Sequence, residues 1–219
     1  MTIDTDIKLY GYYRSSAVYR VRIALELKHL RWQQIQVNLL EGEQRQAAYM
    51  QLNPQGLVPA LATSEGLITQ SLTIIEYLEE KYPQSPLLPS TAIDRACVRS
   101  MAQQIAMEIH PLNNPRVTQF LIAELGVDEE AKLQWYRHWI ALGFTALEQR
   151  LQSTGSNGQY CFGDTATMAD VCLIPQVYNA QRFDCPLEDY PLIRSINDHC
   201  TALPEFIAAS PESIQQAGG

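Results

Sequence analysis

Apolar positions alternate between two periods in the first third of the chain. Four short runs are continuous or alternating in hydrophobicity, which predicts strands: 7–10, 32–39, 58–62 and 67–69. Three segments have apolar residues every three or four positions, which predicts helices, the middle one being short and polar: 18–28, 44–52 and 72–80. The predicted order is β-α-β-α-β-β-α, and its opening strand–helix–strand indicates a parallel βαβ unit.

The pattern changes after a proline-rich stretch at residues 82–89, which we interpret as an interdomain linker. The later periodic segments are all helical: 95–110, 129–151, 169–180 and 192–202. Thr167 and Asp170 have the spacing of a capping box, whereas the polar tail from residue 210 is expected to fray. We therefore expect an α/β domain at residues 1–84 and an all-α domain at residues 90–219.

Charge and cysteine content exclude several functions. The 219 residues carry a formal net charge of −8, which disfavours nucleic acid or an anionic membrane as a partner. Neither a basic, apolar leader nor a run of about 18 apolar residues occurs, so we expect no signal peptide and no membrane span. The five cysteines are scattered and form no CxxC pair, which predicts reduced thiols in the cytoplasm and no metal site.

The junction between the first strand and the first helix carries candidate chemistry. Ser15 and Ser16 lie where the helix should begin, and a helix N-terminus exposes unpaired N–H groups with a partial positive charge. A serine there either caps the helix or, with the backbone amides, holds an anion. Both interpretations are open at this point.

Several motifs extend this junction across the chain. They are SSAVYRVRIAL at 15–25, NPQGLVPAL at 53–61, QSLTIIEYLEE at 70–80, IHPLNN at 109–114, GDTATMAD at 163–170 and PQVYNAQRF at 175–183. Together they resemble the zeta class of cytosolic glutathione transferases, which includes maleylacetoacetate and maleylpyruvate isomerases, over about residues 7–205. The resemblance implies an α/β thioredoxin-like N-terminal domain, an all-α C-terminal domain and a cytoplasmic homodimer.

The resemblance also implies glutathione as the cofactor and assigns residues to it. Ser15 would donate a hydrogen bond to the glutathione sulfur, supported by the first-turn amides at Ser16 and Ala17. A cis peptide bond between Val58 and Pro59 would let the backbone of Val58 pair with the tripeptide. The remaining contacts are assigned to Gln70 and Ser71 for the γ-glutamyl carboxylate, and to Gln44, His110 and Asn114.

The reaction implied is cis–trans isomerisation of a small dicarboxylate by thiol addition, bond rotation and elimination. Arginines at Arg14, Arg116 and Arg182 match family positions near the substrate, where guanidinium groups would bind its carboxylates. Ala17 replaces the cysteine that the zeta motif usually carries. This change makes activity on α-halo acids less expected, whereas isomerisation does not need that cysteine.

Other interpretations accompany these assignments. One alternative is a glutathione transferase or dehalogenase that acts on another electrophile; it would use Ser15 but would not need the paired arginines. The other is a non-catalytic interaction module, which would need neither Ser15 nor the arginines. Within the motifs, Thr167 and Asp170 are expected to be structural, and His110 either packs in a helix bend or contacts ligand. Arg20 and Arg22 are expected to form surface or interface salt bridges.

Overall fold

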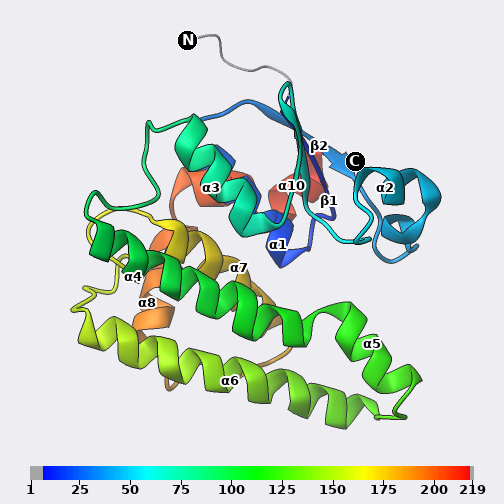
Figure 1. Ribbon diagram of the computed structural model, residues 1–219. Coiled ribbons are helices and arrows are strands. Elements are labelled where there is room, and N and C mark those ends of the chain that lie inside the picture. The colour runs from blue at the N-terminus through cyan, green and yellow to red at the C-terminus, as the bar shows by residue number, and fades with distance from the viewer. Residues whose placement is uncertain (1–6, 218–219) are drawn as a thin grey trace. The chain divides into compact units, whose positions relative to one another are not determined.

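The computed structural model describes residues 7–217; the predicted absence of a signal peptide concerns residues that lie outside this range. The chain divides into two compact units, one formed by Met1–Leu87 with Leu203–Gly219 and the other by Leu88–Ala202 (Figure 1). Among the described residues, no helix is both long and apolar enough to cross a membrane.

The first unit contains a four-stranded mixed sheet in the order β2-β1-β3-β4. Its strands are β1 Ile7–Gly11, β2 Trp32–Gln36, β3 Ala60–Thr63 and β4 Gly66–Thr69. β1 pairs in parallel with β2 and antiparallel with β3, and β3 pairs antiparallel with β4. The predicted parallel βαβ unit is therefore confirmed, although β2 ends three residues before its predicted limit.

The helices of the first unit follow the predicted order. They are α1 Ser16–Leu27, α2 Ala47–Leu52, preceded by a 3₁₀ turn at Glu43–Arg45, and α3 Ser71–Lys81. In α1 the buried side chains surround the helix, because Val18, Val21, Ile23 and Leu25 are all inaccessible to solvent. A helix whose side chains are buried on every side lies in the core of its unit.

The C-terminal segment differs from its prediction. It forms two short helices, α9 Pro204–Ala209 and α10 Pro211–Ala217, where we expected the tail to fray. It belongs to the first unit and not to the predicted helical domain at 90–219, because α9 packs against α1. No local pattern indicates this return, since it depends on contacts between segments almost 190 residues apart, such as the hydrogen bond from Tyr19 Oη to the Phe206 carbonyl.

The second unit is helical, as predicted. Its α-helices are α4 Ala92–Gln103, α5 Pro115–Ala123, α6 Glu129–Ser153, α7 Met168–Arg182 and α8 Pro191–Thr201. The predicted helix at 95–110 changes to a π-helical turn at Gln104–Ile109 and then to a 3₁₀ turn at His110–Asn113. Gly143 of α6 allows the close approach of this π-helical turn, because a Cβ there would lie 2.3 Å from the Ile109 side chain.

The predicted capping box at the start of α7 is confirmed. The Thr167 hydroxyl accepts from the Ala169 amide, and the buried Asp170 carboxylate accepts from the Thr167 and Cys161 amides at 2.8 and 2.7 Å. Burial raises the pKa of Asp170 above its usual value. These two residues therefore stabilise the fold of the second unit, as expected.

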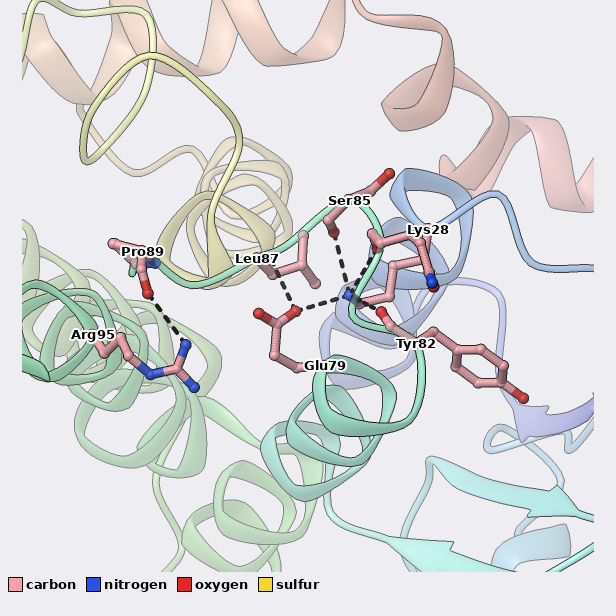
Figure 2. A network of polar contacts seen from close by, with 8 residues as sticks. Lys28, Glu79, Tyr82, Ser85, Leu87, Pro89 and Arg95 are labelled. Carbon is pink, nitrogen blue, oxygen red and sulfur yellow. Dashed lines mark hydrogen bonds and ion pairs between the residues drawn. The ribbon is translucent and has the colours of Figure 1, made fainter. Parts of the chain in front are cut away.

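A buried ion pair fixes the segment that leaves the first unit. Lys28 Nζ lies 2.8 Å from Glu79 Oε2 and donates hydrogen bonds to the Tyr82 and Ser85 carbonyls at 2.8 and 3.2 Å (Figure 2). Glu79 also accepts from the Leu87 amide at 2.9 Å. The proline-rich segment predicted to be a linker is thus tied to the C-terminal ends of both α1 and α3.

Candidate functional site

The N-terminus of α1 is capped by Ser15, which is one of the two roles expected for a serine at this position. The Ser15 hydroxyl oxygen accepts from the Val18 amide at 3.4 Å, and the Ser15 amide donates to the Tyr12 carbonyl at 3.0 Å across a turn. Because the oxygen is only the acceptor in this long bond, the hydroxyl proton stays available for donation. The two interpretations of Ser15 are therefore compatible in one side chain.

Glycine is required where β1 meets α1. A Cβ at Gly11 would lie 2.5 Å from one methyl group of Val18 and 2.6 Å from the other. Both residues are buried, so neither side can move away easily. This close approach brings the end of β1 directly against the first turn of α1, where Ser15, Ser16 and their amides lie.

The N-terminus of α3 forms a second candidate anion site. Ser71 is the first residue of this helix and Gln70 is its N-cap. Gln70 has a positive φ of 70°. Such backbone geometry costs about 1–3 kcal/mol and is concentrated at functional sites.

Side chains around α3 prepare its first turn for an anion. Ser71 Oγ is buried and accepts a hydrogen bond from Arg20 Nη1 at 3.4 Å, which leaves its own proton available for a ligand. Gln70 is exposed and its Nε2 donates to Gln55 Oε1 at 2.8 Å. The guanidinium of Arg20 adds positive charge close to the partial charge of the helix N-terminus.

Arg20 and Arg22 correct the sequence prediction. They are 1% and 0% exposed, so neither side chain lies at the surface as expected. Arg22 donates to the Ala209 and Tyr13 carbonyls at 2.7 and 2.9 Å. One feature of the sequence could have predicted this burial. The polar residues of α1 do not gather on one face, so the helix has no solvent-facing side on which an arginine could lie.

The peptide bond between Val58 and Pro59 is cis, as the family resemblance implied. The preceding turn is anchored, because Tyr49 Oη and Asn53 Nδ2 both donate to the Leu57 carbonyl at 2.7 Å. Burial raises the pKa of Tyr49 to about 12, so it remains a donor at neutral pH. These bonds hold the backbone of Val58 directly before β3.

Gln44 lies in the 3₁₀ turn Glu43–Arg45 of the same unit. Its Oε1 atom is buried and, within residues 7–217, has no hydrogen-bond partner. A buried acceptor without a partner costs about 1–3 kcal/mol, which a ligand donor would relieve. Together with the two helix N-termini, this oxygen fits a peptide ligand that carries both an anion and amide donors, as glutathione does.

The candidate residues of the second unit are less constrained. Asn114 caps α5 by accepting from the Arg116 amide at 3.1 Å, and His110 is half-buried in the 3₁₀ turn. Arg116 and Arg182 are both exposed, and their guanidinium groups form no hydrogen bond or ion pair with any described residue.

Arg182 lies at the C-terminus of α7, above the Phe183 ring at 5.6 Å. That ring stacks on buried Tyr136, with 4.0 Å between centroids. Burial raises the pKa of Tyr136, whose hydroxyl donates to Asn179 Oδ1. The Arg182 side chain therefore packs on the Phe183 ring, which is itself held by Tyr136, while its charged group remains exposed to solvent.

In the first unit, Arg14 is exposed, and its Cζ atom lies 5.0 Å from the Tyr13 ring centroid.

Of the sequence candidates, the structure brings Ser15, Ser16 and Ala17 together at the start of α1, and Gln70 and Ser71 together at the start of α3. His110, Asn114, Arg116 and Arg182 belong to the other unit. No cluster of metal-ligating side chains occurs within the described residues.

Known proteins match nearly the whole chain. The family model of the glutathione S-transferase N-terminal domain matches residues 9–86. A probable maleylacetoacetate isomerase of Vibrio cholerae is 49% identical over 95% of this chain and 97% of its own length.

Two solved structures also match closely. The holo structure of a bacterial zeta-class maleylpyruvate isomerase has a TM-score of 0.92 and 44% identity over 94% of this chain and 97% of its own. A maleylacetoacetate isomerase of Methylobacterium extorquens AM1 with bound malonate and glutathione has a TM-score of 0.91 and 39% identity, with the same coverage. With this similarity extending over both units, the chain belongs to the zeta-class glutathione transferases, the family of the maleylacetoacetate and maleylpyruvate isomerases.

Proposed function

We propose that this protein is a glutathione-dependent cis–trans isomerase of maleylacetoacetate or maleylpyruvate, each converted to its fumaryl isomer. The observation that carries the proposal is the α1 N-terminus, where Ser15 keeps a hydroxyl proton available beside the first-turn amides. Relatives named for these two activities share up to 49% of the sequence. The first unit has no cysteine of its own, so a thiol reaction there requires a thiol from a cofactor.

The residues proposed to hold glutathione divide between its γ-glutamyl end and the rest of the tripeptide. Gln70 and Ser71 bind the γ-glutamyl carboxylate at the N-terminus of α3, while Val58, before cis Pro59, offers backbone groups to the central peptide. Gln44 accepts one of the remaining donors through its buried Oε1 atom. His110 and Asn114 supply further polar contacts.

Ser15 is the proposed catalytic donor. Its hydroxyl donates to the sulfur, and the amides of Ser16 and Ala17 add the positive potential of the helix N-terminus, so both stabilise thiolate over thiol. The bound cofactor supplies a nucleophile that adds to the cis double bond and leaves again after rotation about the resulting single bond. A free thiol normally ionises near pH 8.5, so lowering its pKa increases the reactive fraction at neutral pH.

Arg14, Arg116 and Arg182 are proposed to bind the substrate carboxylates and the carbonyl oxygens that gain negative charge. An acidic protein has to recruit a dicarboxylate through local positive charge. The two arginines of the second unit have exposed guanidinium groups that are not occupied by other described residues, which leaves their donors available. The Methylobacterium relative is described with bound malonate, itself a small dicarboxylate.

We further propose that the protein works as a homodimer in the cytoplasm. Exposed apolar side chains on the second unit, such as Ile93 at 76% and Met107 at 56%, are candidates for burial between subunits. All five cysteines are free, which suits a reducing compartment. Sedimentation of the purified protein would test the dimer.

The experiment is a progress curve with each cis substrate, with and without glutathione, for wild type, Ser15→Ala and Ser15→Thr. We expect wild type to convert at least one substrate with glutathione required but not consumed. Ser15→Ala should lose this activity, and Ser15→Thr, which keeps a hydroxyl, should retain part of it. Consumption of glutathione by an α-halo acid, with neither cis substrate converted, would replace the isomerase with a transferase or dehalogenase. Failure to bind glutathione would leave the non-catalytic module.

A further inference from the structure

Arg22 links two backbone segments that are far apart in the sequence. Its guanidinium is fully buried; Nε donates to the Ala209 carbonyl at 2.7 Å, and Nη2 donates to the Tyr13 carbonyl at 2.9 Å. Cζ also lies 5.2 Å from the centroid of the Tyr19 ring. The planar guanidinium of arginine carries donors on separate nitrogen atoms at a fixed spacing, whereas the donors of lysine all lie on one nitrogen.

The first carbonyl belongs to the C-terminal segment. Ala209 is the last residue of α9, and the carbonyls at a helix C-terminus carry a partial negative charge. This carbonyl therefore suits a buried cation. The Tyr19 hydroxyl adds a second link from α1 to α9 through the Phe206 carbonyl, at 3.5 Å.

The second carbonyl belongs to the turn that leads into Ser15. Tyr13 lies inside the turn closed by the hydrogen bond from the Ser15 amide to the Tyr12 carbonyl, at 3.0 Å. Fixing the Tyr13 carbonyl fixes the orientation of the next peptide unit, because each peptide bond is planar. Together with the hydrogen bond that closes the turn, this orientation restrains the backbone that places Ser15 at the start of α1.

We propose that Arg22 is a positioning residue of the thiol site and that the C-terminal segment Pro204–Ala217 supports this site through it. Arg22 touches neither cofactor nor substrate. It holds the Tyr12–Ser15 turn against α9, so that Ser15 and the first-turn amides remain aimed at the sulfur. The inference rests on the proposed function only in taking Ser15 as the residue that faces glutathione.

Coupling of this kind acts in both directions. If the C-terminal segment stabilises the turn that binds glutathione, then bound glutathione must stabilise the C-terminal segment. Loss of the donors on separate nitrogen atoms should break the coupling even when the buried positive charge is retained. Arg22→Lys is therefore the informative variant.

The first measurement is hydrogen exchange of the full-length protein with and without saturating glutathione. We expect the amides of α9 and α10 to exchange about fivefold more slowly when glutathione is bound. This protection should disappear in Arg22→Lys. It should persist in Glu79→Gln, the matched control, which weakens the buried Lys28 contact at the opposite end of α1.

The second measurement is the pKa of the bound glutathione thiol, from the ultraviolet absorbance of its thiolate. Loss of one positioning hydrogen bond, worth about 1 kcal/mol, should raise this pKa by about 0.5–1 unit in Arg22→Lys. Glu79→Gln should keep the wild-type value. If Arg22 had a purely structural role, Arg22→Lys would lower stability, as Glu79→Gln does, without moving the thiol pKa.

Absence of glutathione-dependent protection of α9 and α10 in wild type would overturn the inference. So would an Arg22→Lys protein that keeps both the protection and the wild-type thiol pKa. A wild type that lowers the thiol pKa but converts neither cis substrate would contradict the proposed function alone and leave the role of Arg22 intact. A wild type that does not bind glutathione would overturn both.

Discussion

The two units hold their candidate site residues in opposite ways. In the first, Ser15 accepts from Val18, Ser71 accepts from buried Arg20, and the Val58 backbone follows a turn anchored by two hydrogen bonds of 2.7 Å. In the second, Arg116 and Arg182 extend into solvent without hydrogen-bonded side-chain partners among the described residues. The proposed glutathione site of the first unit is therefore preorganised by hydrogen bonds, whereas the two arginines of the second unit are not.

The difference corresponds to the two tasks that we propose. Stabilising a thiolate needs donors already aimed at the sulfur, because preorganised donors need no rearrangement when charge develops. Capturing a flexible dicarboxylate needs long cationic side chains that can adjust to it. We therefore expect substitution of Ser15 to affect thiol chemistry and stability together, and substitution of Arg116 or Arg182 to affect substrate binding alone.

The largest effect on stability is expected from breaking the buried pair of the first unit. Lys28→Met leaves Glu79 as an uncompensated buried charge, which typically costs about 3–5 kcal/mol. Denaturant unfolding would measure the loss. Lys81→Met is the control, since its partner Glu65 is exposed; the melting temperature should hardly change. Equal losses in both variants would contradict the preorganised character of this unit.

Ser15→Ala is expected to have the largest effect on catalysis. Removing one preorganised donor at a developing charge lowers kcat by about 10²–10³-fold, and the lost helix cap lowers stability by about 1 kcal/mol. Steady-state kinetics and thermal unfolding of the same sample would separate the two effects. Wild-type kcat in this variant would remove Ser15 from the catalytic role.

Arg116→Gln and Arg182→Gln test the other side of the comparison. Each should lower kcat/KM by about 10–100-fold, because charge-assisted hydrogen bonds contribute about 1.5–3 kcal/mol. Both should leave unfolding and glutathione affinity unchanged, since both side chains are exposed. Arg194→Gln, on the exposed face of α8, is the matched control. An effect no larger than that of the control would favour the transferase interpretation.

Arg20→Lys should have the smallest effect. Weakening its hydrogen bond to Ser71 should raise the dissociation constant of glutathione about fivefold, which corresponds to roughly 1 kcal/mol. A glutathione analogue that lacks the γ-glutamyl α-carboxylate should bind wild type and variant alike. Calorimetry with both ligands checks this, and an equal loss for both would show that Arg20 does not act through Ser71.

The local features of the fold could be predicted because their causes are local. Ser15 at a helix start and the Thr167–Asp170 spacing are signals within a few residues, and both caps are present. The cis bond before Pro59 came from the family motif, since an isolated proline does not specify its isomer.

The missed features depend on contacts between distant segments. Arginine is rarely buried, so Arg20 and Arg22 were expected at the surface, yet their partners Ser71 and Ala209 lie 51 and 187 residues away. The return of the C-terminal segment to α1 was missed for the same reason. A polar sequence at a chain end predicts fraying, and only the contacts of the folded unit show that this segment covers α1.

The most direct test of this division of tasks is the pKa of the bound glutathione thiol in two variants. We expect a lowered pKa, as in wild type, for the double variant Arg116→Gln, Arg182→Gln, although that protein should isomerise poorly. For Ser15→Ala we expect a pKa near that of free glutathione. A normal pKa in the double arginine variant, or a lowered pKa in Ser15→Ala, would show that the two tasks are not divided in this way.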